Sequence, residues 1–341
     1  MKKARLEEVL KEKILILDGA MGTMAQRYKL SESDFRGERF KNWPTDLQGN
    51  NDLLSIVRPD IVKEIHSAYL EAGADMIETN TFSSTRIAMA DYQMEELVTE
   101  LNINAAKIAV EAADHFTRIN PGKPRYVAGA VGPTNRTASI SPDVNNPAFR
   151  GITFDELEKA YFEQISALIV GGVDVILIET IFDTLNAKAA IRATIKANRE
   201  KRTHIPIMIS GTITDASGRT LSGQTVEAFL ISISHAPLLS VGLNCALGAS
   251  EMRPYLEVMS DKAPLFISAY PNAGLPNAFG EYDQGPEEMK IQLRDFLDRN
   301  LVNILGGCCG TTPDHIRMMA ELADGYPPRA LKQKAVSTYG I

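Results

Sequence analysis

The sequence predicts an α/β protein with the (β/α)8 fold of a TIM barrel. Three observations predict it: short apolar runs recur along the whole chain, segments of helical periodicity lie between them, and no linker rich in Pro or Ser divides the 341 residues. Short continuous apolar runs are typical of parallel strands that are buried on both faces. Eight strand–helix units in about 300 residues match a TIM barrel better than an open, doubly wound sheet.

The predicted strands are apolar runs that end in Gly, Asn, Thr or an acidic residue. We expect them over 14–17, 76–77, 126–131, 175–178, 207–209, 241–243, 265–269 and 302–305. Helices are predicted where apolar residues recur every three or four positions, over 59–72, 95–114, 154–171, 184–200, 225–235, 251–261, 286–299 and from 313 onward. Pro59 and Pro313 suit a first helical turn, and Thr312 is a candidate N-cap.

Composition and charge exclude several classes of protein. The 36 basic and 43 acidic side chains give a formal charge of −7, which argues against a nucleic-acid binder with a basic face. No apolar run reaches the about 20 residues of a membrane span, and residues 1–13 read as an amphipathic helix rather than a secretory signal. Three cysteines are too few for a disulfide scaffold, so we expect a cytoplasmic protein.

Long connections follow three of the predicted strands, over 22–55, 132–153 and 211–224. In a TIM barrel these connections lie at the C-terminal ends of the strands, where the catalytic groups are found. Long loops in a compact domain are usually functional. The last one is rich in Gly, Ser and Thr, and we expect it to be a mobile cover.

All three cysteines lie at predicted strand ends: Cys245 after the sixth strand, and Cys308 and Cys309 after the eighth. Three thiolates without histidine are a soft ligand set that selects zinc, and they leave one tetrahedral position open, as in catalytic zinc sites. The alternative is that they are small buried hydrophobic residues. We expect the neighbouring glycines to let the chain turn so that the paired sulfurs face one point; these are Gly306, Gly307 and Gly310.

Acidic residues end the first, second and fourth predicted strands: Asp18, Glu78 and Glu179. A buried carboxylate needs a cationic partner. The turn that contains Gly19, Ala20 and Gly22 exposes backbone amides that can hold an anion. The alternatives are an ordinary tight turn and, for Glu78, a structural hydrogen-bond acceptor.

Several longer phrases carry a family resemblance. They are DGAMGT (18–23), IETNTF (77–82), GPTN (132–135), ETIFDT (179–184), SGQT (222–225), GLNCALG (242–248), YPNAGLPN (270–277) and GGCCGTTPDHI (306–316). Together they resemble the homocysteine S-methyltransferase family over about residues 5–325. The phrases IETNTFSST, LSGQT and NCALGA are more specific to the homocysteine-binding, N-terminal domain of cobalamin-dependent methionine synthase.

The resemblance implies a zinc-dependent methyltransferase that makes methionine. Zinc held by Cys245, Cys308 and Cys309 activates the thiol of L-homocysteine, which accepts a methyl group from methylcobalamin, originally from methyltetrahydrofolate. The methylcobalamin is carried by another module or chain and is not bound by this domain alone.

The resemblance also implies an amino-acid site. Asp18 and Glu179 are the candidates for the substrate ammonium group, with Glu78 beside them, and the amides around Gly19, Ala20 and Gly22 for its carboxylate. Asn272, at the end of the seventh strand, is a candidate for the substrate site and for the zinc's fourth position when substrate is absent. Asn244 is expected to orient its neighbour Cys245.

The chain departs from the complete family enzyme in length. It has no Asp-x-His-x-x-Gly signature for cobalamin ligation, so we expect a partial enzyme without folate and cobalamin modules, with a barrel domain over 1–325 and a tail or linker over 326–341. The main alternative is a free-standing homocysteine methyltransferase that uses S-methylmethionine or betaine. A phosphate-binding barrel leaves the paired cysteines unexplained, and a Schiff-base lyase would need a Lys that none of the predicted strand ends carries. A non-catalytic zinc scaffold would require closed, four-ligand coordination.

Overall fold

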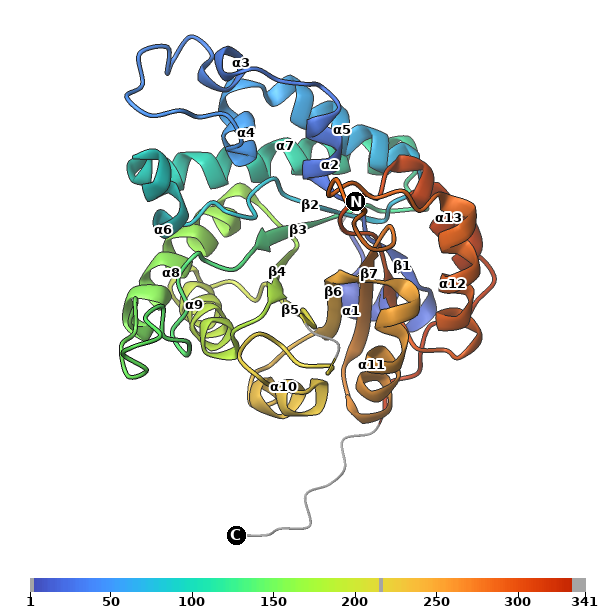
Figure 1. Cartoon of the computed structure of the whole chain (residues 1–341). Helices are drawn as coiled ribbons and strands as arrows, with labels where there is room; N and C mark the ends of the chain where they lie inside the picture. The colour runs from blue at the N-terminus through green and yellow to red at the C-terminus, as the bar shows by residue number, and fades with distance from the viewer. Residues whose placement is uncertain (1–2, 215–216, 333–341) are drawn as a thin grey trace.

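The computed structural model describes residues 3–214 and 217–332, which form a single barrel of eight parallel strands (Figure 1). The strands are β1 (Leu15–Ile16), β2 (Met76–Glu78), β3 (Tyr126–Val131), β4 (Val175–Ile181), β5 (Ile207–Gly211), β6 (Ser240–Gly248), β7 (Phe266–Asn272) and β8 (Ile304–Leu305). Each pairs in parallel with the next along the chain from β2 to β8, and β8 pairs with β1. A parallel bridge between Leu17 and Met76 closes the ring. The predicted TIM barrel is confirmed.

Helices surround the strands. They are α1 (Leu6–Glu12), α2 (Met21–Gln26), α3 (Glu32–Arg36), α4 (Leu54–Val57), α5 (Pro59–Glu71), α6 (Arg86–Met89), α7 (Val98–Ile119), α8 (Phe154–Gly171), α9 (Thr184–Lys201), α10 (Val226–Ile233), α11 (Ala249–Lys262), α12 (Pro286–Asp298) and α13 (Pro313–Ala323). Short 3-10 turns cover η1 (Asn51–Leu53), η2 (Ala90–Tyr92) and η3 (Glu95–Leu97). No helix in the described ranges is long and apolar enough to cross a membrane.

Most element predictions hold, and the differences have physical causes. The helix expected over 95–114 begins as the turn η3 and continues as α7 to Ile119, because Phe116, beyond the predicted end, also packs against the core. The connection over 22–55 is not a plain loop, since α2, α3, η1 and α4 occupy much of it. The expected cover over 211–224 includes residues 215–216, which lie outside the described residues, as does most of the expected tail over 326–341.

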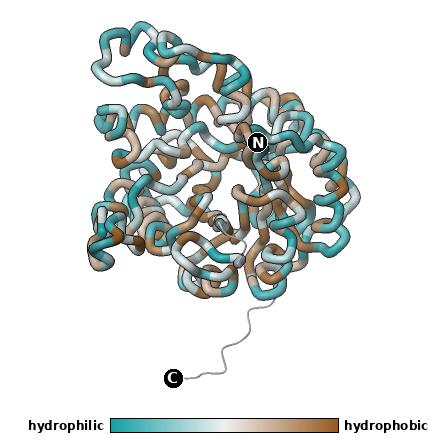
Figure 2. Tube along the Cα trace, in the orientation of Figure 1, coloured by the Kyte–Doolittle hydropathy of each residue, from teal (hydrophilic) through white to brown (hydrophobic). Residues whose placement is uncertain are grey.

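The barrel has two hydrophobic regions. Between strands and outer helices lies the larger core, and Figure 2 shows hydrophobic stretches on the central strands and mixed hydropathy on the helices around them. Inside the barrel, side chains such as Leu15, Tyr126 and Phe266 pack with Leu6 and Leu10 of α1. The N-terminal helix therefore closes one end of the barrel, and lies behind the strands in Figure 1. The C-terminal strand ends form the other end.

Candidate functional site

The three cysteine sulfurs meet at the C-terminal ends of β6 and β8. The Sγ atoms of Cys245 and Cys309 lie 3.7 Å apart, and all three Sγ atoms lie within 4.8 Å of one another. Sulfurs that share a tetrahedral zinc ion are about 3.8 Å apart, given Zn–S bonds of about 2.3 Å. Within residues 3–214 and 217–332, no other group of three or more His, Cys, Asp or Glu side chains is close enough to hold a metal ion. The donor set fits zinc.

The backbone turns at Cys245 in a way that sequence reasoning did not foresee. The β6–β7 register shifts between Asn244 and Gly248, and Cys245 and Ala246 both have a φ of 58°. Non-glycine residues rarely adopt this left-handed conformation. A β-bulge of this kind re-aims a side chain beside an active site. It directs the Cys245 sulfur towards the pair on β8.

The glycines beside Cys308 and Cys309 act differently from the expectation. Only Gly310 has a positive φ, of 80°. Gly306 and Gly307 are needed for close packing, because an added Cβ would lie 2.7 Å from Leu17 Cβ and 2.5 Å from Thr311 Oγ1. The expected sharp turn is therefore confined to one glycine.

The thiols polarise one another. Hydrogen bonds with Cys245, and then with Cys308, lower the pKa of the Cys309 thiol. Hydrogen bonds with Cys245 and Cys309, together with burial, raise the pKa of Cys308. The three thiols are thus inequivalent, with the pKa of Cys309 lowered and that of Cys308 raised.

Two asparagines hold the strand ends that carry the cysteines. Asn272 on β7 accepts a hydrogen bond at its Oδ1 from the backbone N–H of Cys309 at 3.1 Å. That oxygen, expected as a fourth metal ligand, is thus engaged with the backbone. Asn244 is 1% exposed and bonds through its side chain to Thr180 on β4, which fixes the residue next to Cys245.

Three carboxyl groups gather beside the thiols. Asp18 and Glu179 are buried and Glu78 is half-buried. Asp18 Oδ2 accepts the backbone N–H of Glu78 at 3.0 Å, whereas Asp18 Oδ1 is buried without a partner. The ion pairs of the described residues include none to these three carboxyl groups. Their expected cationic partner is not a side chain of the described barrel.

Burial raises the pKa values of all three acids. Burial raises the pKa of Glu78 to about 7. Burial, then the charge of Glu78, raise the pKa of Asp18 and of Glu179 well above their usual range, and the Cys309 thiolate adds to the effect at Glu179. A cation bound here would lower all three values, because it favours the charged carboxylates.

The Gly-rich turn after β1 packs closely under this site. The N–H of Ala20 donates to Thr311 Oγ1 at 3.3 Å, so this amide, expected to hold an anion, already has a partner. A Cβ on Gly19 would lie 2.7 Å from the same oxygen. Gly22 lies in the first turn of α2, and no atom comes closer than 3.8 Å to an added Cβ there.

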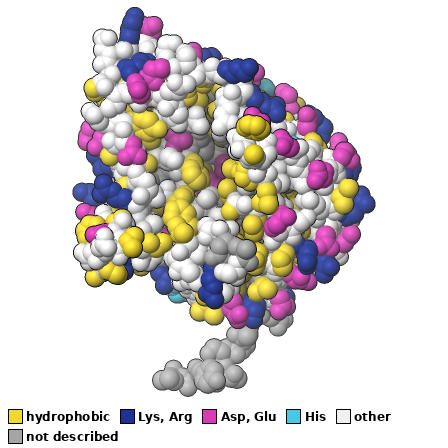
Figure 3. Space-filling view, viewed as in Figure 1, with side chains coloured by type: hydrophobic (Ala, Val, Ile, Leu, Met, Phe, Trp, Pro, Cys, Tyr) yellow, Lys and Arg dark blue, Asp and Glu magenta, His cyan; other side chains and the backbone are white. Residues whose placement is uncertain are grey.

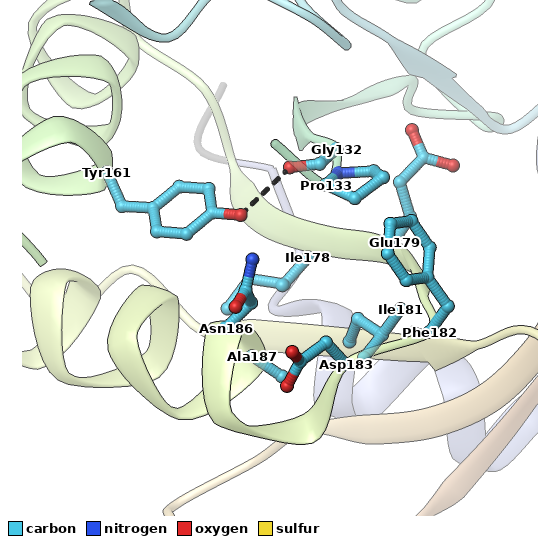
Figure 4. Close-up of a pocket in the computed structure, with 10 residues that line it drawn as sticks. All are labelled: Gly132, Pro133, Tyr161, Ile178, Glu179, Ile181, Phe182, Asp183, Asn186 and Ala187. Atoms are coloured by element: carbon cyan, nitrogen blue, oxygen red, sulfur yellow. Dashed lines mark hydrogen bonds between the residues drawn. The ribbon is translucent and has the colours of Figure 1, made fainter. Parts of the chain in front are cut away.

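A small cavity lies on the helix side of β4. Tyr161, Asp183 and Asn186 line it, and the Tyr161 hydroxyl donates to the Gly132 carbonyl at 3.3 Å. Figure 4 shows that the Glu179 carboxylate points away from Asp183 and Asn186. The space-filling view shows the face at the strand ends hollowed near its centre, with hydrophobic side chains around the hollow (Figure 3).

Sequence reasoning missed two residues of the site. Tyr282, in the segment after β7, lies with its hydroxyl 3.5 Å from Asn272 Nδ2, and burial and the negative charge of Cys309 raise its pKa. Thr180 binds Asn244. Tyr282 has no motif signal, whereas Thr180 follows Glu179 directly in the phrase ETIFDT.

The chain is similar to known homocysteine methyltransferases. The family model described as homocysteine S-methyltransferase matches residues 15–323. Three solved structures of the homocysteine methyltransferase MmuM from Escherichia coli share the fold. The oxidized form has a TM-score of 0.70 at 20% identity, covering 91% of this chain and 96% of that chain. The metallated form has a TM-score of 0.69 at 21% identity, with the same coverage. The apo form has a TM-score of 0.65 at 20% identity, covering 92% and 96%.

Proposed function

The chain belongs to the homocysteine S-methyltransferase family, and from this premise we propose a zinc-dependent transfer of a methyl group from methylcobalamin to L-homocysteine. The observation that carries the proposal is the meeting of three thiols with three carboxyl groups that have no cationic side-chain partner among residues 3–214 and 217–332. An amino-acid thiol supplies both missing parts, a sulfur and an ammonium group.

The residues divide into two halves of one site. Cys245, Cys308 and Cys309 would hold the zinc ion, which as a Lewis acid keeps a coordinating thiol deprotonated at neutral pH. The three cysteine thiolates carry one negative charge more than the dication neutralises. They therefore limit the loss of nucleophilicity that accompanies a lowered thiol pKa.

The carboxyl groups bind the other end of the substrate. Asp18 Oδ1 is buried without a donor, and Glu179 lies close enough to Cys309 to be affected by its charge. An ammonium group placed between Asp18, Glu78 and Glu179 would satisfy these oxygens. The substrate carboxylate would face the turn around Gly19 and Gly22. Asn272 would line the site through its contact with Cys309.

The transfer is a displacement at carbon. The substrate sulfur forms an S–CH3 bond as the bond between the methyl carbon and its donor breaks, and the electron pair of that bond leaves with the donor. The thiol proton has already been lost to solvent when the sulfur binds. The product is methionine, whose thioether is a weak ligand and leaves readily.

Methylcobalamin is our choice of donor for two reasons. The phrases IETNTFSST, LSGQT and NCALGA favour it. In addition, exposed large hydrophobic side chains stand on the segments that follow β2, β3, β5 and β7, and they are Phe82, Val144, Phe149, Leu221, Leu275 and Phe279. Contiguous exposed apolar surface marks interaction sites, and Figure 3 shows hydrophobic side chains around the hollow on this face. They suit a bulky corrinoid on a cobalamin-carrying domain or protein better than a small sulfonium or betaine.

The test measures zinc content and methionine formation on one sample. Zinc-loaded protein is given homocysteine with methylcobalamin, S-methylmethionine or betaine, and a Cys308→Ala variant serves as the control. Methionine from methylcobalamin supports the proposal. Methionine from S-methylmethionine or betaine alone establishes the free-standing alternative, and no methionine from any donor contradicts both.

A further inference from the structure

Two β-bulges flank β5 at the mouth of the barrel. The β4–β5 register shifts between Ile178 and Ile181, and the β6–β7 register shifts after Asn244. Each bulge contains a residue in the left-handed region: Thr180 with a φ of 54° and Cys245 with a φ of 58°. For a β-branched residue such as Thr180 this conformation is a genuine outlier. Strain of this kind persists only where the surrounding contacts over-determine it.

The side chain of Asn244 joins the two bulges. Its Oδ1 accepts the backbone N–H of Thr180 at 3.0 Å, and its Nδ2 donates to Thr180 Oγ1 at 2.8 Å. Thr180 is on β4 and Asn244 on β6, and these two strands do not pair with each other because β5 lies between them. The amide of Asn244 thus supplies a direct polar link between β4 and β6.

The strand between them completes the connection. Thr212 directly follows β5. Its Oγ1 donates to the carbonyl of Asn244 at 3.0 Å, and its N–H donates to the carbonyl of Ile181 at 2.8 Å. Thr212 is 4% exposed, so water does not compete for these bonds. The ends of three strands are therefore fixed relative to one another.

We propose that this Thr180–Asn244 clamp sets the distance between the Glu179 carboxylate and the Cys245 sulfur, and thereby selects the length of the amino-acid thiol. The proposal rests on the proposed function, because it takes Glu179 as an ammonium partner and Cys245 as a metal ligand. Each clamp residue is the chain neighbour of one of these groups. Movement of either bulge changes the span that a substrate must bridge.

A clamp that fixes this span makes the site discriminate between homocysteine and cysteine. Cysteine is one methylene shorter, so in a rigid site it cannot place its sulfur and its ammonium group together. One methylene typically changes discrimination about 10- to 200-fold. A loosened clamp leaves the two bulges free to shift, so the span is no longer fixed and the site discriminates less against the shorter thiol.

The test compares affinities for the two thiols. Thr180→Val removes the hydroxyl acceptor and keeps the branched shape, and Thr180→Gly removes it with a residue that adopts the left-handed region freely. Thr180→Ser keeps the acceptor. Thr194→Val is the matched control, because Thr194 is fully buried in α9 and its hydroxyl bonds the Ala190 carbonyl at 2.9 Å.

Calorimetry on zinc-loaded protein gives the dissociation constants for L-homocysteine and L-cysteine, and zinc analysis gives the metal content. We expect full zinc content in all variants and a ratio of homocysteine to cysteine affinity that falls about tenfold in Thr180→Val and Thr180→Gly. The ratio stays near the wild-type value in Thr180→Ser and Thr194→Val. An equal loss for both thiols, an unchanged ratio, or loss of zinc overturns the clamp. A wild-type protein that binds no homocysteine overturns the proposed function instead.

Discussion

The sulfurs of Cys245 and Cys309 lie 3.7 Å apart although 64 positions separate the two residues in the chain. Their strands, β6 and β8, are the two neighbours of β7 in the barrel. The parallel arrangement brings both strand ends to one rim, and the bulge in β6 turns Cys245 towards its partner. A metal site built from the ends of these two strands therefore depends on the whole fold.

Removal of any one sulfur should abolish zinc binding. Cys245→Ala, Cys308→Ala and Cys309→Ala each leave two thiols, which hold zinc far more weakly than three. Metal analysis of the purified variants should show less than about a tenth of the wild-type zinc content, with circular dichroism confirming the fold. Full zinc content together with homocysteine binding in one variant would show that its cysteine is not a ligand.

A second prediction concerns Asn272, which holds the backbone of the proposed zinc ligand Cys309 in place. Asn272→Ala leaves the N–H of Cys309 without its acceptor, so we expect zinc affinity to fall about 10-fold or more, as for other residues that support metal ligands. Chelator competition without homocysteine measures this. Asn277→Ala is the control, since Asn277 caps an exposed turn of the same segment through the N–H groups of Phe279 and Glu281.

An affinity for zinc that is unchanged in Asn272→Ala would contradict this role. X-ray absorption at the zinc edge separately identifies the atoms bound to zinc. If Asn272 is instead the fourth ligand in the absence of homocysteine, the wild-type spectrum contains an oxygen neighbour that the variant lacks.

The sequence allows the barrel to be predicted because each strand and helix has its own local pattern. The helix over 154–171 agrees with α8 to the residue, since Thr153 and Glu156 form a capping box and Gly172 ends it in the left-handed region. The meeting of the cysteine-bearing strand ends follows from the topology, whereas the turn of Cys245 towards its partners does not. The bulges at Thr180 and Cys245 were not predictable, because their left-handed residues are not glycines and arise from bonds between distant strands.

Stability of the metal-free, reduced protein should fall as pH rises through the acidic range. The folded-state pKa of Glu78 is about 7, against an ordinary value near 4.5, because burial disfavours its charge. Between these values the folded protein holds a proton that the unfolded chain releases, so the free energy of unfolding falls with rising pH. Glu78→Gln should flatten this dependence between pH 5 and 7. The change in the free energy of unfolding that the substitution removes is on the order of a few kcal/mol at most.

Thermal unfolding across this pH range measures the effect. Glu200→Gln is the control, because Glu200 is exposed near the end of α9, at the opposite end of the barrel. A Glu78→Gln variant with the same pH dependence as the wild type would refute the carboxyl cluster as its source. Homocysteine should raise the stability of the wild-type protein more above pH 7 than below it, because the Glu78 carboxylate is then charged and the ammonium group of homocysteine neutralises it.

Leu10 should be important for stability and unimportant for the metal site. It is fully buried in the cluster inside the barrel that also contains Leu15 and Phe266, and it lies on α1, which closes the N-terminal end. Leu10→Ala removes this contact and leaves a cavity, so we expect a loss of about 2–5 kcal/mol in the free energy of unfolding. Ile231→Ala, at a site 67% exposed on α10, should change it by less than about 0.5 kcal/mol. Denaturant unfolding measures both values. Zinc content should remain at the wild-type level in Leu10→Ala. The reason is that Asn244 and Asn272, rather than α1, hold the strand ends that carry the sulfurs. Loss of zinc would show that the two ends of the barrel are coupled.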